Sequence, residues 1–364
     1  MKILIIKPSS LGDVIHSLPF LKAIKNTFHD ADIEWVISKN LKEILEGNPL
    51  INRLIVFDKD SWTKIGNLSK TVKEAIGLIN ILKSGHYDMV VDLQGLLRSG
   101  LITFFTSSPL KVGFKNAREG SSIFYNKKIS VNGSLHAVDR YLEIAKAIRQ
   151  GSGVSPPRFA ERGRGGQSTT HGGSGKAEFP LNVDKTAAEN IKKLLGGLKE
   201  KEYVVVIPSA RWKTKRWSPE NFGTLISKLS VPCIVTGSKA DEQIIKEVMR
   251  FSNGKGTNFC GKTDLKELTA LIAGAKAVVS NDSGPMHIAA ALGVPVIALF
   301  GPTDPYKTGP YGWSEIRAEQ EKKNLRVIRA SISCSPCFKK KCKDPLCMRG
   351  ISVDTVLEEM KEYL

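Results

Sequence analysis

A repeated alternation of short apolar segments with longer amphipathic ones constrains the fold most strongly. In the first part of the chain the apolar segments are rich in Ile and Val, as expected of strands that are buried on both faces of a sheet. These segments span residues 2–6, 33–37, 53–57 and 87–92. Helical patterns are expected between or after them at residues 14–26, 41–45, 69–82 and 137–149. This βαβ series predicts a parallel sheet with helices on both faces.

The same alternation begins again in the second half of the chain. Strands are expected at residues 203–207, 233–236, 277–280 and 294–300, and helices at 184–195, 219–229, 241–250, 265–273 and 284–292. We detect no sequence repeat between the two halves. The predicted fold is α/β, with two doubly wound, Rossmann-like domains that face each other across a cleft. Ligands are expected beyond the carboxyl ends of the strands.

The composition changes abruptly between the two series. Residues 151–177 are rich in Gly, Ser and Arg and contain few apolar side chains, so this segment cannot bury enough surface to fold. We therefore predict an N-terminal domain at residues 1–150, a flexible linker at 151–177, a C-terminal domain at 178–350 and a final helix at 351–364.

The charge balance narrows the class of partner. Among 364 residues there are 54 Lys and Arg against 36 Asp and Glu, which gives a net charge of +18. This excess favours an anionic partner, such as nucleic acid, an acidic membrane surface or a phosphorylated substrate. No apolar run approaches the roughly 20 residues of a membrane span, and the first residues resemble a buried strand rather than an export signal. We therefore expect a cytoplasmic protein. Candidate contacts to a membrane surface are the segment 61–69, with Trp62 and Lys64, and the basic stretch 339–343.

The first βα turn carries a candidate catalytic carboxylate. Ser9, Ser10 and Gly12 form the turn, and Asp13 lies where the next helix begins. Position alone favours a helix cap, whereas the carboxyl edge of a sheet is also where a general base can act. The turn lacks the GxGxxG pattern of dinucleotide-binding proteins and the GxxxxGK[ST] pattern of P-loops. This argues against a nucleotide-dependent dehydrogenase.

Two later turns have the character of an anion site. A buried strand ends in SNDSGPMH, residues 280–287, where Ser283 and Gly284 can offer main-chain N–H groups at the start of a helix. The loop PSARWKTKRW, residues 208–217, follows another strand, and its cations suit the neutralisation of phosphate. Within it, we expect Lys215 to be an exposed loop cation whose removal leaves the fold intact. The acids of the loop at residues 236–242 are candidates for contacts with ribose or adenine.

Together these motifs resemble those of the family nine glycosyltransferases, the ADP-heptose:lipopolysaccharide heptosyltransferases. The matching segments are KPSSLGD (7–13), DLQGL (92–96), ARE (117–119), FYN (124–126), KRW (215–217) and NDSGPMH (281–287). The resemblance covers nearly the whole chain outside residues 151–175. The DLQGL, ARE and FYN segments favour heptosyltransferase I, whereas the Cys-rich C-terminal region is more similar to heptosyltransferase II.

The resemblance implies a GT-B-like fold and an inverting transfer of L-glycero-D-manno-heptose from ADP-heptose to the Kdo-lipid A inner core of lipopolysaccharide, with no cofactor. It implies Asp13 as the general base, and Ser10, Gly12 and Arg118 on the acceptor side, in the N-terminal domain. The donor-binding residues that it implies, in the C-terminal domain, are Ser209, Lys215, Asp241, Asp282, Ser283, Gly284 and His287. One departure precedes Lys215, where Ala and Arg replace the small hydroxyl residues of the family. The acceptor is an anionic glycolipid, so the enzyme is expected on the inner face of the inner membrane as a peripheral protein.

Several alternatives stay open. The acceptor can be that of heptosyltransferase II or of another family member. A basic nucleic-acid-binding protein is a more remote possibility, because the cations and aromatic residues are not organised as an RNA or DNA module. The six cysteines are expected to be reduced. Cys233 and Cys260 are expected in the core, and the other four form either a structural zinc site or a surface loop with incidental thiols. These four are Cys334, Cys337, Cys342 and Cys347.

Overall fold

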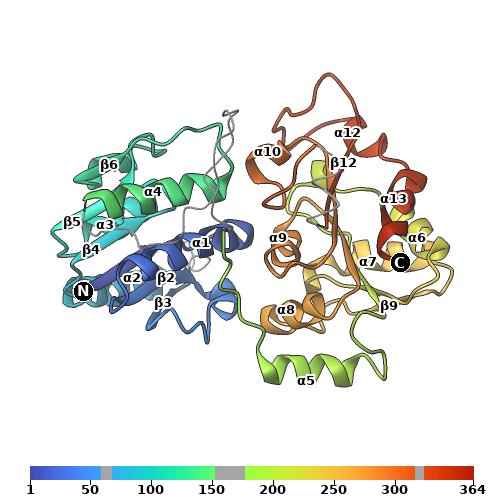
Figure 1. Ribbon diagram of the computed structural model, residues 1–364, viewed down its shortest axis with the longest axis horizontal. Helices are drawn as coiled ribbons and strands as arrows, with labels where there is room; N and C mark the ends of the chain where they lie inside the picture. Colours follow the sequence, from blue (N-terminus) through green and yellow to red (C-terminus); the bar gives the residue numbers. More distant parts are fainter. Residues whose placement is uncertain (59–67, 152–176, 316–323) are drawn as a thin grey trace, which may run out of the picture. The chain divides into compact units, whose positions relative to one another are not determined.

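The structure, a computed structural model, describes residues 1–58, 68–151, 177–315 and 324–364. The predicted linker at 151–177 lies outside the described residues except at its two ends, and so does most of the segment 61–69. The chain divides into two units, which are drawn in blue to green and in green to red in Figure 1. Unit 1 comprises Met1–Ser9, His16–Lys42 and Asn48–Pro180, and unit 2 comprises Ser10–Ile15, Glu43–Gly47 and Leu181–Leu364.

The first sheet has six parallel strands in the order β3-β2-β1-β4-β5-β6. The strands are β1 (Lys2–Ile6), β2 (Asp32–Ser38), β3 (Arg53–Phe57), β4 (Met89–Asp92), β5 (Leu110–Phe114) and β6 (Lys127–Ile129). Ile5 of the central strand β1 pairs with Trp35 on one side and with Val91 on the other. β1 and β4 are buried nearly throughout because helices cover both faces, which explains their continuous apolar runs.

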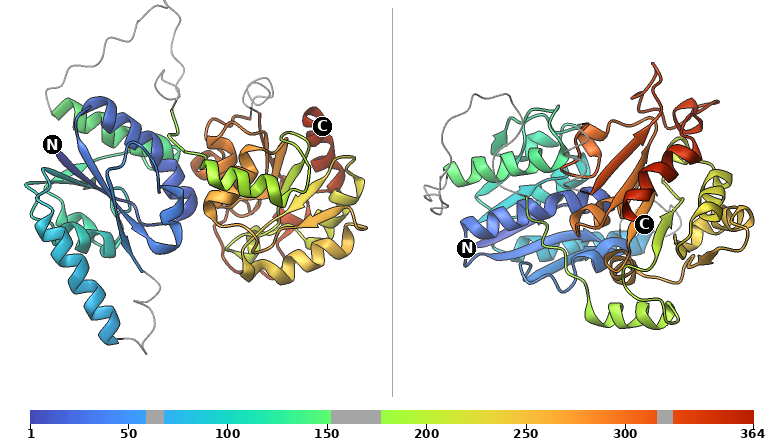
Figure 2. Two further views of the ribbon diagram at one scale, coloured as in Figure 1. Left: turned by 90° about the horizontal axis from the view of Figure 1, so that it is seen from below. Right: turned by 45° about the vertical axis from the view of Figure 1, so that its right-hand side comes forward.

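Helices connect these strands (Figures 1 and 2). They are α1 (Leu11–Thr27), α2 (Leu68–Ser84), α3 (Leu97–Phe104) and α4 (Ala137–Gly151), with the 3-10 turns η1 (Lys39–Ile44) and η4 (Ser121–Phe124). α2 and α3 contribute to one hydrophobic cluster, in which Leu78, Leu82 and Ile102 pack with Leu4 and Val36 of the sheet.

The second sheet also has six parallel strands, in the order β12-β11-β10-β7-β8-β9. The strands are β7 (Val204–Ile207), β8 (Cys233–Val235), β9 (Gly256–Asn258), β10 (Ala277–Asn281), β11 (Val296–Phe300) and β12 (Leu325–Arg329). When its strands are counted from β7, this order is the same as that of the first sheet. β7 therefore corresponds to β1, and β10 corresponds to β4.

The helices of unit 2 follow the same alternation. They are α5 (Lys185–Leu194), α6 (Pro219–Lys228), α7 (Glu242–Phe251), α8 (Leu265–Ala273), α9 (Gly284–Ala291), α10 (Pro305–Thr308), α12 (Leu346–Arg349) and α13 (Val353–Met360), with the 3-10 turns η5 (Lys213–Lys215), η6 (Lys239–Asp241) and η7 (Lys361–Tyr363). Trp217 is buried in the core, where its Nε1 donates to the Ile351 carbonyl at 2.9 Å. Val356 and Met360 of α13 pack into the same core, so the predicted final helix is an integral part of unit 2.

The predicted fold class is confirmed by the two doubly wound parallel sheets. Four strands were not predicted, namely β5, β6, β9 and β12. β6 and β9 have three residues each, and β5 and β12 carry Lys or Arg among their apolar residues, so none of the four gives a clear apolar run. In the described part of the chain, no helix combines the length and the apolar character needed to cross a bilayer.

Candidate active site

The order of each sheet reverses beside its first strand, between β1 and β4 and between β7 and β10. In open α/β sheets this switch point is where ligands bind, beyond the carboxyl ends of the strands. The residues singled out in the sequence follow these strands. Asp13 follows β1, Ser209 and Lys215 follow β7, and Asp282 follows β10.

Asp13 lies in the first turn of α1 and is half-buried. Its Oδ2 accepts a hydrogen bond from the Ser10 amide at 3.0 Å and another from Ser10 Oγ at 2.8 Å. A carboxylate that reaches back three residues in this way stabilises the start of a helix. The capping contact is therefore present, and it engages one of the two carboxylate oxygens. At the end of β1, the ammonium of the buried Lys7 donates to the Leu93 carbonyl at 3.1 Å, which ties β1 to the turn after β4.

The DLQGL, ARE and FYN segments, which lie far apart in the sequence, form one hydrogen-bond network in unit 1. Asp92 is fully buried, and its Oδ2 accepts from the Tyr125 hydroxyl at 2.6 Å. Its Oδ1 accepts from the amides of Gln94 at 2.8 Å and Gly95 at 3.1 Å. The Gly95 carbonyl in turn accepts from the Arg118 amide at 2.9 Å. The network fixes the backbone of Arg118 and leaves its side chain exposed.

Burial raises the pKa of the Asp92 carboxyl group above its ordinary value, and the hydrogen bonds that the group accepts oppose this rise. Burial and the neighbouring Asp92 also raise the pKa of the Tyr125 hydroxyl group. The partners of Asp92 are thus neutral groups. Through these hydrogen bonds, the Asp92 side chain holds the surrounding loops in place.

Asn281, the last residue of β10, organises the basic loop of unit 2. Its side chain is fully buried, with Oδ1 accepting from the Trp217 amide at 3.0 Å and Nδ2 donating to the Pro208 carbonyl at 2.8 Å. The two contacts bind both ends of the loop after β7 to the end of β10. Ser209, half-buried, follows Pro208 directly and so lies at this edge.

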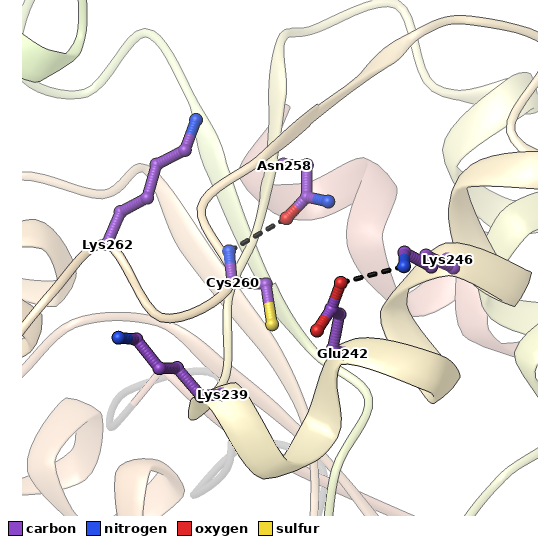
Figure 3. A pocket seen from close by; sticks show the side chains of 6 residues that line it. All are labelled: Lys239, Glu242, Lys246, Asn258, Cys260 and Lys262. Atoms are coloured by element: carbon purple, nitrogen blue, oxygen red, sulfur yellow. Dashed lines mark hydrogen bonds and ion pairs between the residues drawn. The ribbon is translucent and has the colours of Figure 1, made fainter.

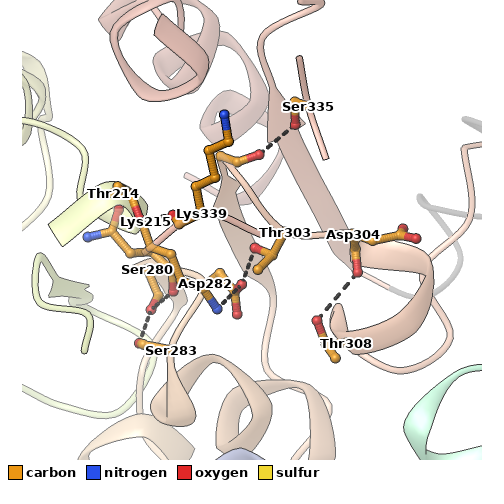
Figure 4. A network of polar contacts seen from close by, with 12 residues as sticks. Thr214, Lys215, Ser280, Asp282, Ser283, Thr303, Asp304, Thr308, Ser335 and Lys339 are labelled. Atoms are coloured by element: carbon orange, nitrogen blue, oxygen red, sulfur yellow. Dashed lines mark hydrogen bonds and ion pairs between the residues drawn. The ribbon is translucent and has the colours of Figure 1, made fainter. Parts of the chain in front are cut away.

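Asp282 and Lys215 form an ion pair at the same edge, shown in Figure 4. The Lys215 ammonium donates to Asp282 Oδ2 at 2.6 Å, and Thr303 Oγ1 donates to the same oxygen at 2.5 Å. Only 16% of the Lys215 side chain and 5% of the Asp282 side chain are exposed. The expectation of an exposed Lys215 was therefore wrong, because the loop folds its side chain towards a buried carboxylate. An ammonium has three N–H donors, and the pair with Asp282 uses one of them.

The start of α9 lies beside this pair. Ser283 is the residue before the helix, its hydroxyl is 3.2 Å from Ser280 Oγ, and it makes no side-chain cap. Gly284 and Pro285 form the first turn. The first N–H groups of a helix and the helix dipole together attract anions. His287 lies on the buried face of α9, with 6% of its surface exposed.

The basic stretch 339–343 meets the loop after β7. Thr214 Oγ1 donates to the Lys339 carbonyl at 2.9 Å. The Lys215 and Lys340 ammonium groups lie 4.7 Å and 5.4 Å from the centre of the Trp212 ring, which is a distance of cation–π attraction. Sequence reasoning missed Lys340 as a neighbour of Lys215 because 125 residues separate them. The run of lysines was the available signal, and it was assigned to a membrane contact instead.

A cavity of about 360 Å³ opens on the same side of the sheet, at the ends of β8 and β9 (Figure 3). It is lined by Lys239, Glu242, Lys246, Asn258, Cys260 and Lys262. Lys246, at 2.7 Å, holds the pKa of Glu242 below its usual value. Asp241 is not among the residues that line the cavity, and its Oδ2 accepts from the Ser238 amide at 2.9 Å and from Ser238 Oγ at 2.7 Å. The acid that lines the cavity is thus Glu242, the residue after the predicted one.

The cysteines of the C-terminal region differ in burial. Cys347 is buried, Cys337 is half-buried, and Cys334 and Cys342 are exposed. Within the described ranges, no three His, Cys, Asp or Glu side chains are arranged to hold a metal ion. Cys233 lies in the core of unit 2, as expected. Burial raises its pKa to about 12, so it remains a thiol.

Comparison with known proteins identifies the family. The family model for glycosyltransferase family 9 (heptosyltransferase) matches residues 76–347. The chain belongs to glycosyltransferase family 9. This family 9 chain is 29% identical to lipopolysaccharide heptosyltransferase 1 of Pseudomonas aeruginosa, over 100% of the chain and 98% of the relative. It is 27% identical to lipooligosaccharide heptosyltransferase 2 of Campylobacter jejuni, over 100% and 99%. The solved structure of E. coli heptosyltransferase WaaC with ADP is similar, with 25% identity, a TM-score of 0.76 and 100% of each chain covered.

Membership in the family makes this protein a glycosyltransferase of the GT-B-like fold, as the motifs of the sequence implied. Both sheets contribute to the match with WaaC, which spans the whole chain. The family match itself includes the Asp92 network, the basic loop after β7 and the turn at the start of α9.

Proposed function

We propose that this enzyme transfers a heptose from ADP-heptose to the Kdo-lipid A inner core of lipopolysaccharide, as a heptosyltransferase I. The observation that carries the proposal is the arrangement around Lys215, where a buried ion pair holds a cation beside the uncapped start of α9. This combination suits the diphosphate of a nucleotide sugar. The names of the most similar curated relatives supply the sugar and the acceptor class.

The donor diphosphate is proposed to bind between the Lys215 ammonium and the amides of Ser283 and Gly284. Asp282 and Thr303 hold the ammonium in place, and its two further N–H donors can contact phosphate oxygens. Because the ammonium is positioned before the donor arrives, little side-chain entropy is lost on binding.

The nucleoside is proposed to occupy the cavity at the carboxyl ends of β8 and β9, with Glu242 accepting from the ribose hydroxyls. Its volume of about 360 Å³ is at the lower end of the range of small-ligand sites. β8 is the neighbour of β7 in the sheet, so this cavity and the Lys215 loop share one edge of unit 2.

The chemistry is proposed to be a single displacement with inversion. The carboxylate of Asp13 takes the proton of the acceptor hydroxyl as its oxygen attacks the anomeric carbon. The bond from that carbon to the diphosphate breaks, and ADP leaves with its charge stabilised by Lys215 and the start of α9. One carboxylate is enough for this reaction because no covalent sugar–enzyme intermediate forms. Ser10, Gly12 and Arg118 are proposed to face the acceptor.

The acceptor is proposed to reach the enzyme at an anionic membrane surface, on the inner face of the inner membrane. The support for this is the net charge of +18, since exposed cations attract a protein to acidic lipids by about 1 kcal/mol each. No cofactor is required, because cations of the chain carry the leaving group.

A second candidate acceptor is that of a heptosyltransferase II. The identity to the Campylobacter jejuni heptosyltransferase 2 is close to that found for the heptosyltransferase 1 relatives, and it extends over nearly the full length of both chains. This observation favours a heptosyltransferase II acceptor as the second candidate. The two candidates share the donor site and differ only in whether the acceptor already carries a heptose.

The test is to incubate the full chain with ADP-heptose and to measure ADP release and product mass with two acceptors. One is Kdo-lipid A, and the other is the same lipid already bearing one heptose. The proposal expects transfer to Kdo-lipid A. Transfer only to the heptose-bearing lipid would show that the acceptor is that of a heptosyltransferase II. If neither acceptor leads to ADP release, both candidate functions are rejected.

A further inference from the structure

α3 presents most of its large apolar residues to solvent, whereas its buried face carries small or polar residues and a single large apolar one, Ile102. The side chains of Leu97, Leu101 and Phe104 are 44%, 41% and 56% exposed. They are spaced by four and three residues, so they share one face of the helix. The opposite, buried face carries Ser99, Gly100, Ile102 and Thr103. A helix that only packs on a core has the reverse pattern.

This orientation of α3 is fixed by its neighbours. A Cβ atom at Gly100 would come within 2.5 Å of the Phe124 ring, so the glycine permits close packing of α3 on η4. The rings of Phe104 and Phe124 are 5.8 Å apart in an edge-to-face arrangement. The buried hydroxyl of Thr103 is satisfied by the Ser99 carbonyl at 3.0 Å. The packing of the buried face of α3 therefore fixes the helix in an orientation that exposes Leu97 and Leu101.

Ile123 extends the exposed face. It belongs to η4, which packs on α3, and 72% of its side chain is exposed. We call the four side chains Leu97, Leu101, Phe104 and Ile123 the α3–η4 surface. Scattered exposed apolar residues are ordinary, whereas a group of four large ones on two adjacent elements is typical of an interaction site.

Cations predominate over acids in the part of the chain that forms this surface. Residues 97–128 contain six Lys or Arg and a single acid, Glu119. Glu119 is turned towards the start of α3, where its Oε2 accepts from the Leu97 amide at 3.1 Å. Lys111 donates to the Phe104 carbonyl at 3.2 Å, and its ammonium lies 6.0 Å from the Phe104 ring. Arg98 is exposed on α3 itself.

We propose that the α3–η4 surface is the part of unit 1 that inserts into the headgroup region of an anionic bilayer. Exposed apolar side chains with Lys111 and Arg98 beside them match the two layers of such a surface, the acyl boundary and the acidic headgroups. A second copy of the chain fits less well, because it would bring Lys111 and Arg98 against cations of its own kind. This inference rests on the proposed function, which places the acceptor in a membrane.

The surface also adjoins the residue proposed to contact the acceptor. Arg118 lies in the segment between β5 and η4, and its carbonyl accepts from Ser121 Oγ at 3.0 Å and from the Ser121 amide at 3.1 Å. Ser121 is the first residue of η4. A bilayer that contacts Ile123 would therefore lie close to Arg118, which is five positions earlier in the sequence. This placement suits an acceptor whose sugar extends from the lipid surface.

The experiment measures the binding of the full chain to sedimented vesicles made from equal parts of phosphatidylglycerol and phosphatidylcholine. The main variant combines Phe104→Ser with Ile123→Ser. Ile123→Ser alone is the second variant, because Ile123 is the most exposed of the four and its removal disturbs least packing. The matched control is Leu194→Ser, which removes an exposed leucine of unit 2 that is 38% accessible. Melting temperatures verify that each variant is folded.

We expect the double variant to weaken vesicle binding by at least about tenfold, Ile123→Ser to weaken it by a smaller factor, and the control to bind like the wild type. Wild-type binding to vesicles of phosphatidylcholine alone is expected to be weaker, because the cations lack acidic partners. Equal vesicle binding by the folded double variant and the wild type would overturn the inference. So would a dimer of the wild type that the double variant dissociates, because the surface would then hold a second copy.

Activity separates this inference from the proposed function. The double variant is expected to lose transfer to Kdo-lipid A in vesicles and to retain transfer to a deacylated, soluble Kdo acceptor. If the wild type transfers heptose to neither acceptor, the proposed function fails, while the vesicle measurement still decides the role of the surface. If the double variant loses transfer to both acceptors equally, the surface acts in catalysis and the inference is overturned.

Discussion

Asp92 and Asp282 lie at the carboxyl ends of corresponding strands, in two sheets of the same strand order, and Asp282 is two positions further along its strand's register. Asp92 is the last residue of β4, and Asp282 follows β10, the strand that corresponds to β4. Both side chains are buried, but their partners differ. Asp92 accepts from a hydroxyl and from backbone amides, whereas Asp282 accepts from the Lys215 ammonium and a hydroxyl.

The difference teaches that buried carboxylates at the same edge of two like sheets serve two purposes. In unit 1 the carboxylate fastens the DLQGL turn to Tyr125 and, through Gly95, to Arg118. In unit 2 the carboxylate fixes a cation at the switch point of the sheet. The strand order therefore places both carboxylates at the carboxyl edge of a sheet. The residues that donate to each carboxylate determine whether it holds loops in place or positions a cation for a ligand.

The largest expected effect concerns the carboxylate that follows β1. Changing Asp13→Asn should lower turnover by roughly 10² to 10⁴, because an amide cannot take the proton of the acceptor hydroxyl. The melting temperature and the affinity for ADP should change little, since Asn can still accept from Ser10. The measurement is turnover at saturating donor and acceptor.

The matched control is Asp241→Asn, because Asp241 makes the same contact with Ser238 that Asp13 makes with Ser10. This variant removes an equivalent capping carboxylate and should keep turnover at saturating donor within a few-fold of the wild type. Near-normal turnover of Asp13→Asn would leave Asp13 with a capping role alone and direct attention to Asp92 and Glu119.

The next effect tests the partners of the two carboxylates directly. Asp282→Asn should lower the free energy of unfolding by about 3 kcal/mol, because it leaves a largely buried ammonium without its counter-charge. Tyr125→Phe removes one neutral hydrogen-bond donor from Asp92 and should lower the free energy of unfolding by about 1 to 2 kcal/mol. The measurement is the melting transition by calorimetry, with the exposed Lys213→Ala as a control that should change stability by less than about 0.5 kcal/mol.

Equal losses for Asp282→Asn and Tyr125→Phe would contradict the distinction between the two carboxylates. A double variant of Asp282→Asn and Lys215→Met sharpens it. If the pair is coupled, the double variant should lose less stability than the sum of the two single variants.

The smallest effect is a pH dependence that arises from Asp92. In the unfolded chain its carboxyl group ionises near its ordinary pKa of 3.8, whereas burial raises the pKa in the folded protein. The folded state therefore binds the proton more tightly, and stability is lost as the pH rises from about 4 through the raised pKa. Asp92→Asn removes this titration.

The measurement is the difference in melting temperature between Asp92→Asn and the wild type across a pH series. The melting temperature of Asp92→Asn relative to that of the wild type should increase as the pH rises above about 4. A difference that stays constant with pH, or that shifts in favour of the wild type, would contradict the raised pKa.

Much of the fold could be predicted from the sequence because the central strands are continuous apolar runs. The central strand β1 was predicted with its observed bounds, and so were the edge strand β3 and the helix α8. The edge strands β6 and β9 could not be predicted, since three residues at the edge of a sheet need little apolar character. α3 was missed as well, because its polar residues face inward and its apolar face is exposed.

The site was predicted as a set of turns but not as a set of contacts. The motif NDSGPMH and the basic loop were identified from their residues, yet the burial of Lys215 was not. That burial depends on Asp282 and Thr303, which lie 67 and 88 residues further along the chain. The DLQGL, ARE and FYN segments were noted separately, and only the folded structure joins them through Asp92, Tyr125 and Arg118.

The most direct test of the account is a calorimetric titration of ADP into the full chain. The central claim is that the Lys215 ammonium, held by Asp282, binds the diphosphate at the β7–β10 edge of unit 2. The account predicts that ADP binds the wild type, that Lys215→Ala weakens the affinity by at least about tenfold, or roughly 1.4 kcal/mol, and that Lys213→Ala changes it by less than about twofold. An unchanged ADP affinity in a folded Lys215→Ala variant would contradict the claim.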